Sequence, residues 1–125
     1  MAKLFLSLAS ISGALAVILG AFGAHGLHDK VSPDMLAVYQ TGIQYQFYHT
    51  LALLAVGLLL QRLPANQWLN ASGWLLIGGI VLFSGSLYWL ALGGPRWLGP
   101  VTPLGGLAFI LAWGCLLVAV FKTKA

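Results

Sequence analysis

Apolar residues are gathered into four long runs along this 125-residue chain, and most polar residues lie between the runs. The runs extend over Leu4–Ala24, Met35–Leu60, Ala71–Leu92 and Leu104–Phe121. Each one approaches or exceeds the roughly 20 residues that an α-helix needs to cross the hydrocarbon core of a bilayer. An open strand would leave backbone polar groups unpaired in lipid. The pattern therefore predicts an all-α integral membrane bundle of four transmembrane helices, with residues 1–125 forming a single transmembrane domain.

The composition agrees with this prediction. The chain is 60% hydrophobic and only 6% charged, whereas soluble domains contain about 25% charged residues. The first run resembles a secretory signal, but it is longer than the roughly 7–15 apolar residues of such a signal. We therefore expect it to be a retained first span. The single cysteine, Cys115, has no partner for an intrachain disulfide and no zinc-type spacing.

Turn and capping residues mark several helix ends. Ser32, Pro33 and Asp34 combine an N-cap, a proline at the first helical position and a carboxylate at the positive end of the helix dipole. Thr102-Pro103 is expected to begin the fourth helix in the same way. Gly93-Gly94-Pro95 is expected to end the third helix.

Charged residues predict the orientation in the membrane. Six cationic and two acidic side chains give a net charge of +4, which is too sparse to indicate nucleic-acid binding. Both termini and the second loop share one side and carry Lys3, Arg62, Lys122 and Lys124. The other side carries only Lys30 and Arg96. Because positive charge prefers the cytoplasm, we expect a multi-pass protein of the inner (plasma) membrane with both termini cytoplasmic.

Small residues recur at helical spacing in three of the four runs. Such stripes let helix backbones approach closely in lipid, where hydrophobic burial does not drive association. We expect helix-packing roles for Gly13, Gly20, Gly78, Gly85, Ala108 and Ala112.

The segment Tyr39–Thr50, with the sequence YQTGIQYQFYHT, is unusually polar for a membrane span. At 100° per residue its polar side chains surround the helix instead of sharing one face. The segment should therefore lie above the acyl chains, or be contacted on several sides by helices, water or another subunit. His49 lies near the helix midpoint and fits neither explanation easily.

An ionisable side chain at this depth is a functional candidate by default. His49 could instead be a neutral ring that hydrogen-bonds a neighbouring helix through Ser84, Ser86 or a main-chain carbonyl. The candidate ligand or proton site comprises Gln44, Tyr45, Gln46, Tyr48 and His49. It would suit a small proton-coupled transporter that uses His49, or a site for a quinone, haem or lipid.

Catalytic chemistry has little support in the sequence. Asp29 and Asp34 are the only carboxylate side chains, and the chain has no evident nucleophile–base pair. His25 and His28 are three residues apart but lack convincing further metal ligands. We therefore expect no enzyme activity, no metal site and no resident cofactor.

Four motifs resemble a known family. GAFGAHGL ends the first run, YHTLALL lies in the second, FSGSLY in the third and TPLGGLAFILAW at the start of the fourth. Together they resemble the YgdD-type family of small inner-membrane proteins, which is related to the eukaryotic transmembrane protein 256. The resemblance implies a four-helix membrane protein of uncharacterised activity and supplies no substrate, cofactor or catalytic residue.

The leading expectation is a structural or accessory membrane protein that acts through helix–helix packing. Its partners would be the lipid bilayer and either further copies of itself or a larger membrane complex.

Overall fold

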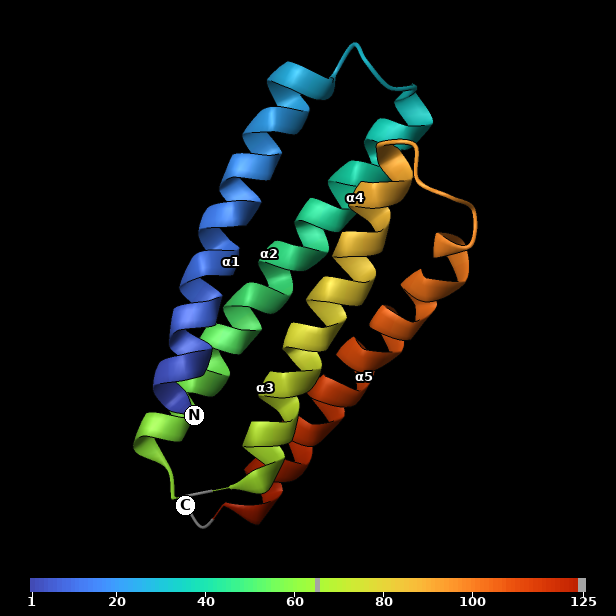
Figure 1. Ribbon diagram of the computed structural model, residues 1–125. Helices are drawn as coiled ribbons and strands as arrows, with labels where there is room; N and C mark the ends of the chain where they lie inside the picture. Colours follow the sequence, from blue (N-terminus) through green and yellow to red (C-terminus); the bar gives the residue numbers. More distant parts are fainter. Residues whose placement is uncertain (65, 124–125) are drawn as a thin grey trace.

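Four antiparallel helical spans form an elongated bundle in the computed structural model, which describes residues 1–64 and 66–123 (Figure 1). The spans are Ala2–Leu27, Pro33–Arg62, Gln67–Ala91 and Leu98–Lys122. All four are long and apolar enough to cross a membrane. The described residues contain no strand. The predicted all-α fold with four transmembrane helices is confirmed.

Two of the spans include a short π-helical turn. The first span consists of α1 (Ala2–Phe22) and the π turn η1 (Gly23–Leu27). The second is the single helix α2 (Pro33–Arg62). The third consists of α3 (Gln67–Gly79), the π turn η2 (Ile80–Ser84) and α4 (Gly85–Ala91), and the fourth is α5 (Leu98–Lys122).

The cap predicted at the start of the second span is present. Ser32 is the N-cap of α2, and its hydroxyl accepts a hydrogen bond from the main-chain N–H of Met35 at 3.2 Å. Pro33 occupies the first helical position. At the end of the third span, Gly93 has a φ of 96°, a left-handed conformation that favours glycine.

The predicted start of the fourth helix is wrong. α5 begins at Leu98, so Pro103 lies inside the helix and Thr102 is not its cap. The first helical N–H groups have no partner within a helix, so Pro100 is tolerated in the first turn. The Thr102 hydroxyl instead shares a 2.5 Å hydrogen bond with the Ser86 hydroxyl of α4.

α2 lies at the centre of the arrangement. It packs against α1 on one side and against α3, η2 and α4 on the other, and α5 packs mainly along the third span. Met1, the end of α5 and the connection from α2 to α3 lie at the same end of the bundle (Figure 1). The connection from α1 to α2 and that from α4 to α5 lie at the opposite end.

Large side chains packed over glycines bring the helices close together. Phe5 of α1 lies where a Cβ on Gly73 would be, and Phe109 of α5 covers Gly79 in the same way. A Cβ on Gly42 would lie 2.6 Å from the Tyr88 ring. These glycines leave room for an aromatic ring from a neighbouring helix, which is how tight contacts form without a hydrophobic driving force in lipid.

The small residues predicted to pack fall into two groups. Gly13 and Gly20 lie against α2, where an added Cβ would meet Thr50 and Ile43 at ordinary contact distances of 3.6 and 3.8 Å. Ala112 is fully buried in α5, and Ala108 is half-buried. Gly78 and Gly85 do not pack against another helix of the same chain, because no atom lies within 4 Å of an added Cβ at either position. For these two glycines the predicted packing role inside the bundle is wrong. Both glycines are on the outward side of the third span.

Candidate functional site

The polar half of α2 is contacted by other helices on several sides. Gln46 and Thr50 face α1, Gly42 meets the third span, and His49 faces α5. For Gln46, His49 and Thr50 the structure supports contact by neighbouring helices. Gln40, Gln44 and Tyr48 are exposed on the surface of the bundle. The buried polar groups on this half of α2 therefore contact α1, the third span and α5 between them.

Gln46 connects three of the four spans. Its Nε2 donates to the main-chain carbonyl of Ser12 in α1 at 2.9 Å, and its Oε1 accepts the hydroxyl of Tyr88 in α4 at 2.5 Å. Ser12 and Thr50 also share a hydrogen bond of 2.7 Å between their hydroxyls. Interhelical hydrogen bonds in membrane proteins contribute about 0.6 kcal/mol on average and up to roughly 1.7 kcal/mol. The Gln46 cluster, defined as Ser12, Gln46, Thr50 and Tyr88, therefore fixes the positions of the first three spans.

Other buried hydroxyls also connect pairs of helices. Ser84 donates to the carbonyl of Gly42 at 2.7 Å, and Ser72 donates to the carbonyl of Ala112 at 2.8 Å. The Tyr39 hydroxyl donates to the carbonyl of Leu19 at 2.5 Å. Every one of these donors satisfies a carbonyl on a different span, so buried polarity stabilises the bundle.

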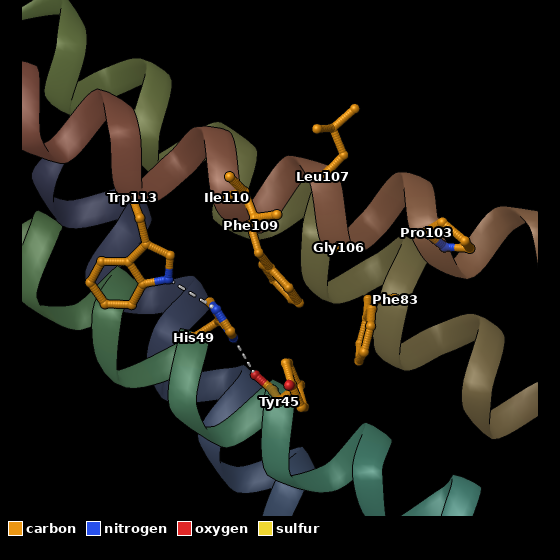
Figure 2. Close-up of a pocket in the computed structure, with 9 residues that line it drawn as sticks. All are labelled: Tyr45, His49, Phe83, Pro103, Gly106, Leu107, Phe109, Ile110 and Trp113. Atoms are coloured by element: carbon orange, nitrogen blue, oxygen red, sulfur yellow. Dashed lines mark hydrogen bonds between the residues drawn. The ribbon is translucent and has the colours of Figure 1, made fainter.

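His49 has a hydrogen bond at each ring nitrogen and is only 6% exposed. Nδ1 lies 2.8 Å from the main-chain carbonyl of Tyr45, and Nε2 lies 3.2 Å from the indole nitrogen of Trp113. A carbonyl can only accept and an indole N–H can only donate, so the ring is the neutral tautomer with its proton on Nδ1. The Phe109 ring stacks on the imidazole at 3.6 Å with an interplanar angle of 9° (Figure 2).

The partners of His49 differ from those suggested by the sequence. Ser84 and Ser86 hydrogen-bond elsewhere, to Gly42 and to Thr102. The main-chain carbonyl that pairs with His49 belongs to its own helix, one turn earlier. The contact with the neighbouring helix is made by Trp113. The sequence signal that could have identified this partner is a tryptophan near the middle of the last apolar run, away from the membrane interfaces where tryptophan is enriched.

A cavity of about 580 Å³ lies beside His49, between α2, η2 and α5 (Figure 2). We call it the His49 groove. It is lined by Tyr45, His49, Phe83, Pro103, Gly106, Leu107, Phe109, Ile110 and Trp113. Leu107 and Ile110 on its rim are exposed, so the groove opens toward the side of the bundle that faces lipid. Its walls are mainly aromatic.

The five predicted site residues do not form one constellation. Tyr45 and His49 line the groove, whereas Gln46 is committed to the Gln46 cluster on another face of α2. Tyr48 is 57% exposed and does not line the groove. Gln44 is exposed beside a smaller cavity of about 250 Å³ between the first span and α2. The sequence did not reveal that Phe83 and Phe109 come from other helices to complete the site.

Metal-ligating side chains are dispersed. Within residues 1–64 and 66–123, no group of three His, Cys, Asp or Glu side chains lies close enough to hold a metal ion. His28 and Asp29 are adjacent and exposed, with 3.1 Å between Nδ1 and Oδ1.

A family model described as "Protein of unknown function (DUF423)" matches residues 19–106. The chain belongs to the DUF423 family. Curated relatives extend over nearly its whole length. The UPF0382 membrane protein YwdK of Bacillus subtilis is 48% identical over 120 residues, covering 96% of this chain and 98% of the relative. A UPF0382 membrane protein of Staphylococcus epidermidis is 47% identical, covering 96% and 97%.

Membership of the DUF423 family confirms the expectation of an uncharacterised membrane family. Together with the four apolar spans, it makes this a multi-pass membrane protein of unknown biochemical activity. The matched range contains the polar half of α2 and the π turn η2, and it ends within the His49 groove at Gly106. No solved structure matches the chain.

Proposed function

We propose that this DUF423 protein is a non-catalytic accessory protein of the inner (plasma) membrane that binds another transmembrane helix through the outward face of its third span. The observation that carries the proposal is the uncovered pair Gly78 and Gly85. They are seven residues apart, so they lie on nearly the same side of the span.

The contrast with the other glycines supports a binding role for this pair. Inside the bundle, Gly73 and Gly79 each receive an aromatic ring from another helix. Glycine in a helix is about 1 kcal/mol less favourable than alanine. At Gly78 and Gly85 nothing within the chain offsets that cost, whereas a second helix lying across the pair would gain close backbone contact. Exposed Trp74 and Val81 lie beside the pair and would add apolar contact area.

The interior of the bundle supports a fixed scaffold. Among buried side-chain nitrogen and oxygen atoms in the described part of the chain, only Oδ1 of Asn70 has no hydrogen-bond partner. These satisfied polar groups hold the helices in one arrangement.

A proton-coupled transporter that uses His49 is less well supported. A proton could be added to the ring only at Nε2, which already accepts the Trp113 N–H. Protonation would therefore break the connection between α2 and α5. The geometry favours a role for this imidazole in holding the two helices together.

Cross-linking in native-lipid nanodiscs tests the accessory role. A cysteine at Val81, together with Cys115→Ser to remove the natural thiol, should give a disulfide-linked product with a second copy when a mild oxidant is added. A photoreactive group attached to the same cysteine should give a cross-linked product with a helix of a larger membrane complex. Gly78→Ile and Gly85→Ile should abolish either product by separating the helices. Gly114→Ile is the matched control, because Gly114 on α5 also has no atom within 4 Å of an added Cβ. A strictly monomeric protein with no cross-linked product would contradict the proposal.

The charges at the two ends support cytoplasmic termini. Lys3, Arg62 and Lys122 lie at the end that contains Met1, and no acidic side chain lies among the described residues there. At the opposite end, Lys30 and Arg96 are balanced by Asp29 and Asp34. Lys124, which the sequence-based count included, lies outside the described residues. The excess of positive charge at the first end favours placing it in the cytoplasm.

A further inference from the structure

The His49 groove has flat aromatic surfaces where a helix bundle in lipid would ordinarily present aliphatic side chains. The Tyr45 and Phe83 rings are 4.6 Å apart between centroids, and Phe83 and Phe109 are 5.6 Å apart. The His49 imidazole stacks on one face of the Phe109 ring and fixes its position. Aromatic pairs in offset or tilted arrangements gain about 0.5–1.5 kcal/mol beyond their burial. A flat ring entering the groove would gain this energy, whereas a saturated acyl chain would not.

The hydroxyl of Tyr45 is an unused hydrogen-bond donor at the groove. The side chain is 39% exposed, and its hydroxyl hydrogen-bonds no other group within the described residues. Placing a hydroxyl in an apolar environment without a partner costs several kcal/mol on alkane-based scales and roughly 1–3 kcal/mol in proteins. A ligand that accepts a hydrogen bond from Tyr45 would remove this cost.

The acceptors around the groove are already occupied. Nε2 of His49 accepts from Trp113, and the Tyr45 carbonyl accepts from Nδ1 of His49. The free hydrogen-bonding group on these two residues is therefore the Tyr45 hydroxyl, because both ring nitrogens of His49 are paired. A carbonyl oxygen on a ligand can accept the proton of this hydroxyl.

The length of the groove limits the size of its occupant. Pro103 and Trp113 lie at its two ends along α5 and are ten residues apart, which corresponds to about 15 Å at 1.5 Å per residue. This is about half of the roughly 30 Å hydrocarbon core of a bilayer. A single ring and the first part of a chain would fit, and the rest of the chain would leave past Leu107 and Ile110 into lipid.

We propose that the His49 groove is a binding site for a lipid-soluble carbonyl-bearing ring with a hydrocarbon tail, the chemistry of a membrane quinone. The ring lies against Tyr45 and Phe83 at the open side of the groove, above the buried Phe109 ring that forms its floor. One carbonyl oxygen accepts a hydrogen bond from the Tyr45 hydroxyl, and the tail follows Ile110 into the bilayer. His49 is a positioning residue, because it holds Phe109 and Trp113 in place and does not touch the ligand through a free nitrogen. Haem is a poorer fit, because its iron would have to take Nε2 of His49 from Trp113.

Equilibrium binding of a radiolabelled 1,4-benzoquinone with a ten-carbon tail, measured on the purified full chain in phosphatidylcholine nanodiscs, tests this site. We expect saturable binding. Tyr45→Phe removes only the hydroxyl and should weaken binding about three- to tenfold, as expected for loss of one hydrogen bond. Tyr48→Phe is the matched control, since Tyr48 carries the same exposed hydroxyl outside the groove, and it should leave the affinity unchanged.

A second pair of variants tests occupancy of the groove without relying on the hydroxyl. An added Cβ on Gly106 would make an ordinary contact of 3.8 Å with the Phe83 ring, and Gly106 lines the groove, so the side chain of Gly106→Val should occupy part of it. Gly106→Val should abolish saturable binding, while Gly114→Val on the open face of α5 should not. A methyl ester of a saturated fatty acid serves as the competitor, with an ester carbonyl and a hydrocarbon chain but no ring. Equal displacement by that ester, or equal affinity of Tyr45→Phe and Tyr48→Phe, would overturn the proposal.

Discussion

Trp113 of α5 donates its indole N–H to Nε2 of His49 in α2 across 3.2 Å. This contact explains how an imidazole fits into a membrane span. The other ring nitrogen is paired with the Tyr45 carbonyl at 2.8 Å, and the Phe109 ring covers one face. The polarity of His49 is therefore satisfied inside the bundle. The Trp113–His49 hydrogen bond fixes the distance between α2 and α5 along one wall of the His49 groove.

The energy of this contact can be measured with a double-mutant cycle. His49→Phe and Trp113→Phe should each lower the free energy of unfolding. The double variant should lose less than the sum of the two, because both single changes break the same hydrogen bond. We expect a coupling of about 0.5–1.7 kcal/mol, the range found for interhelical hydrogen bonds in membranes. Reversible unfolding in mixed micelles provides the measurement, and strictly additive losses would count against the bond.

The protonation state of His49 gives a separate prediction. Since its two partners are a carbonyl and an indole N–H, the proton should be on Nδ1 and absent from Nε2 at neutral pH. Nitrogen-15 spectra of the ring, with Trp113→Phe as the comparison, would show this directly. A proton found on Nε2 in the unmodified protein would be inconsistent with the geometry described above.

Two adjacent glycines on α5 should respond differently to the same substitution. A Cβ on Gly105 would collide with the main chain of Phe83, whereas one on Gly106 would make an ordinary contact with the ring of that residue. Gly105→Ala should therefore lower the free energy of unfolding by about 1–3 kcal/mol. Gly106→Ala should be neutral or stabilising by up to about 1 kcal/mol, because alanine is the better helix former. Thermal unfolding of the two variants side by side would decide, and equal stabilities would contradict the close contact.

The proposed orientation predicts the location of fused reporters. Green fluorescent protein fused to the C-terminus should fluoresce, and alkaline phosphatase fused there should be inactive, because both report a cytoplasmic location. Phosphatase inserted after Lys30 should be active. Changing Lys3 and Arg62 to glutamine should reduce the bias toward this orientation. The opposite pattern of reporter activity in the unmodified protein would reverse the proposed topology.

The sequence predicted those features that depend on solubility in lipid or on local chemistry. Apolar run length was enough to find the four spans, since only a helix satisfies its own backbone in hydrocarbon. The Ser32 cap was recognisable because its hydrogen bond is made three residues away, at Met35. Thr102 was misassigned for a related reason. Its sequence context resembles that of an N-cap, but its hydroxyl hydrogen-bonds the Ser86 hydroxyl of another helix.

The candidate site was predicted less well, because it depends on which helix faces which. Gln44, Gln46 and Tyr48 look equivalent in the sequence, yet only Gln46 meets two other spans. Glycine spacing has the same ambiguity. Gly78 and Gly79 are neighbours, but only Gly79 lies beneath a ring from α5. Periodicity places residues on a face without identifying the helix that the face contacts.

The buried polar side chains of α2 hold the other helices in place. Gln46→Leu and Gln44→Leu remove the same amide from positions two residues apart, one in the Gln46 cluster and one exposed. The decisive measurement is the free energy of unfolding of both variants in the same bilayer-mimetic micelle. We predict a loss of about 1–3 kcal/mol for Gln46→Leu, which leaves the Tyr88 hydroxyl and Ser12 without their partner, and less than about 0.5 kcal/mol for Gln44→Leu. Equal effects of the two substitutions, or a more stable Gln46→Leu protein, would contradict the account.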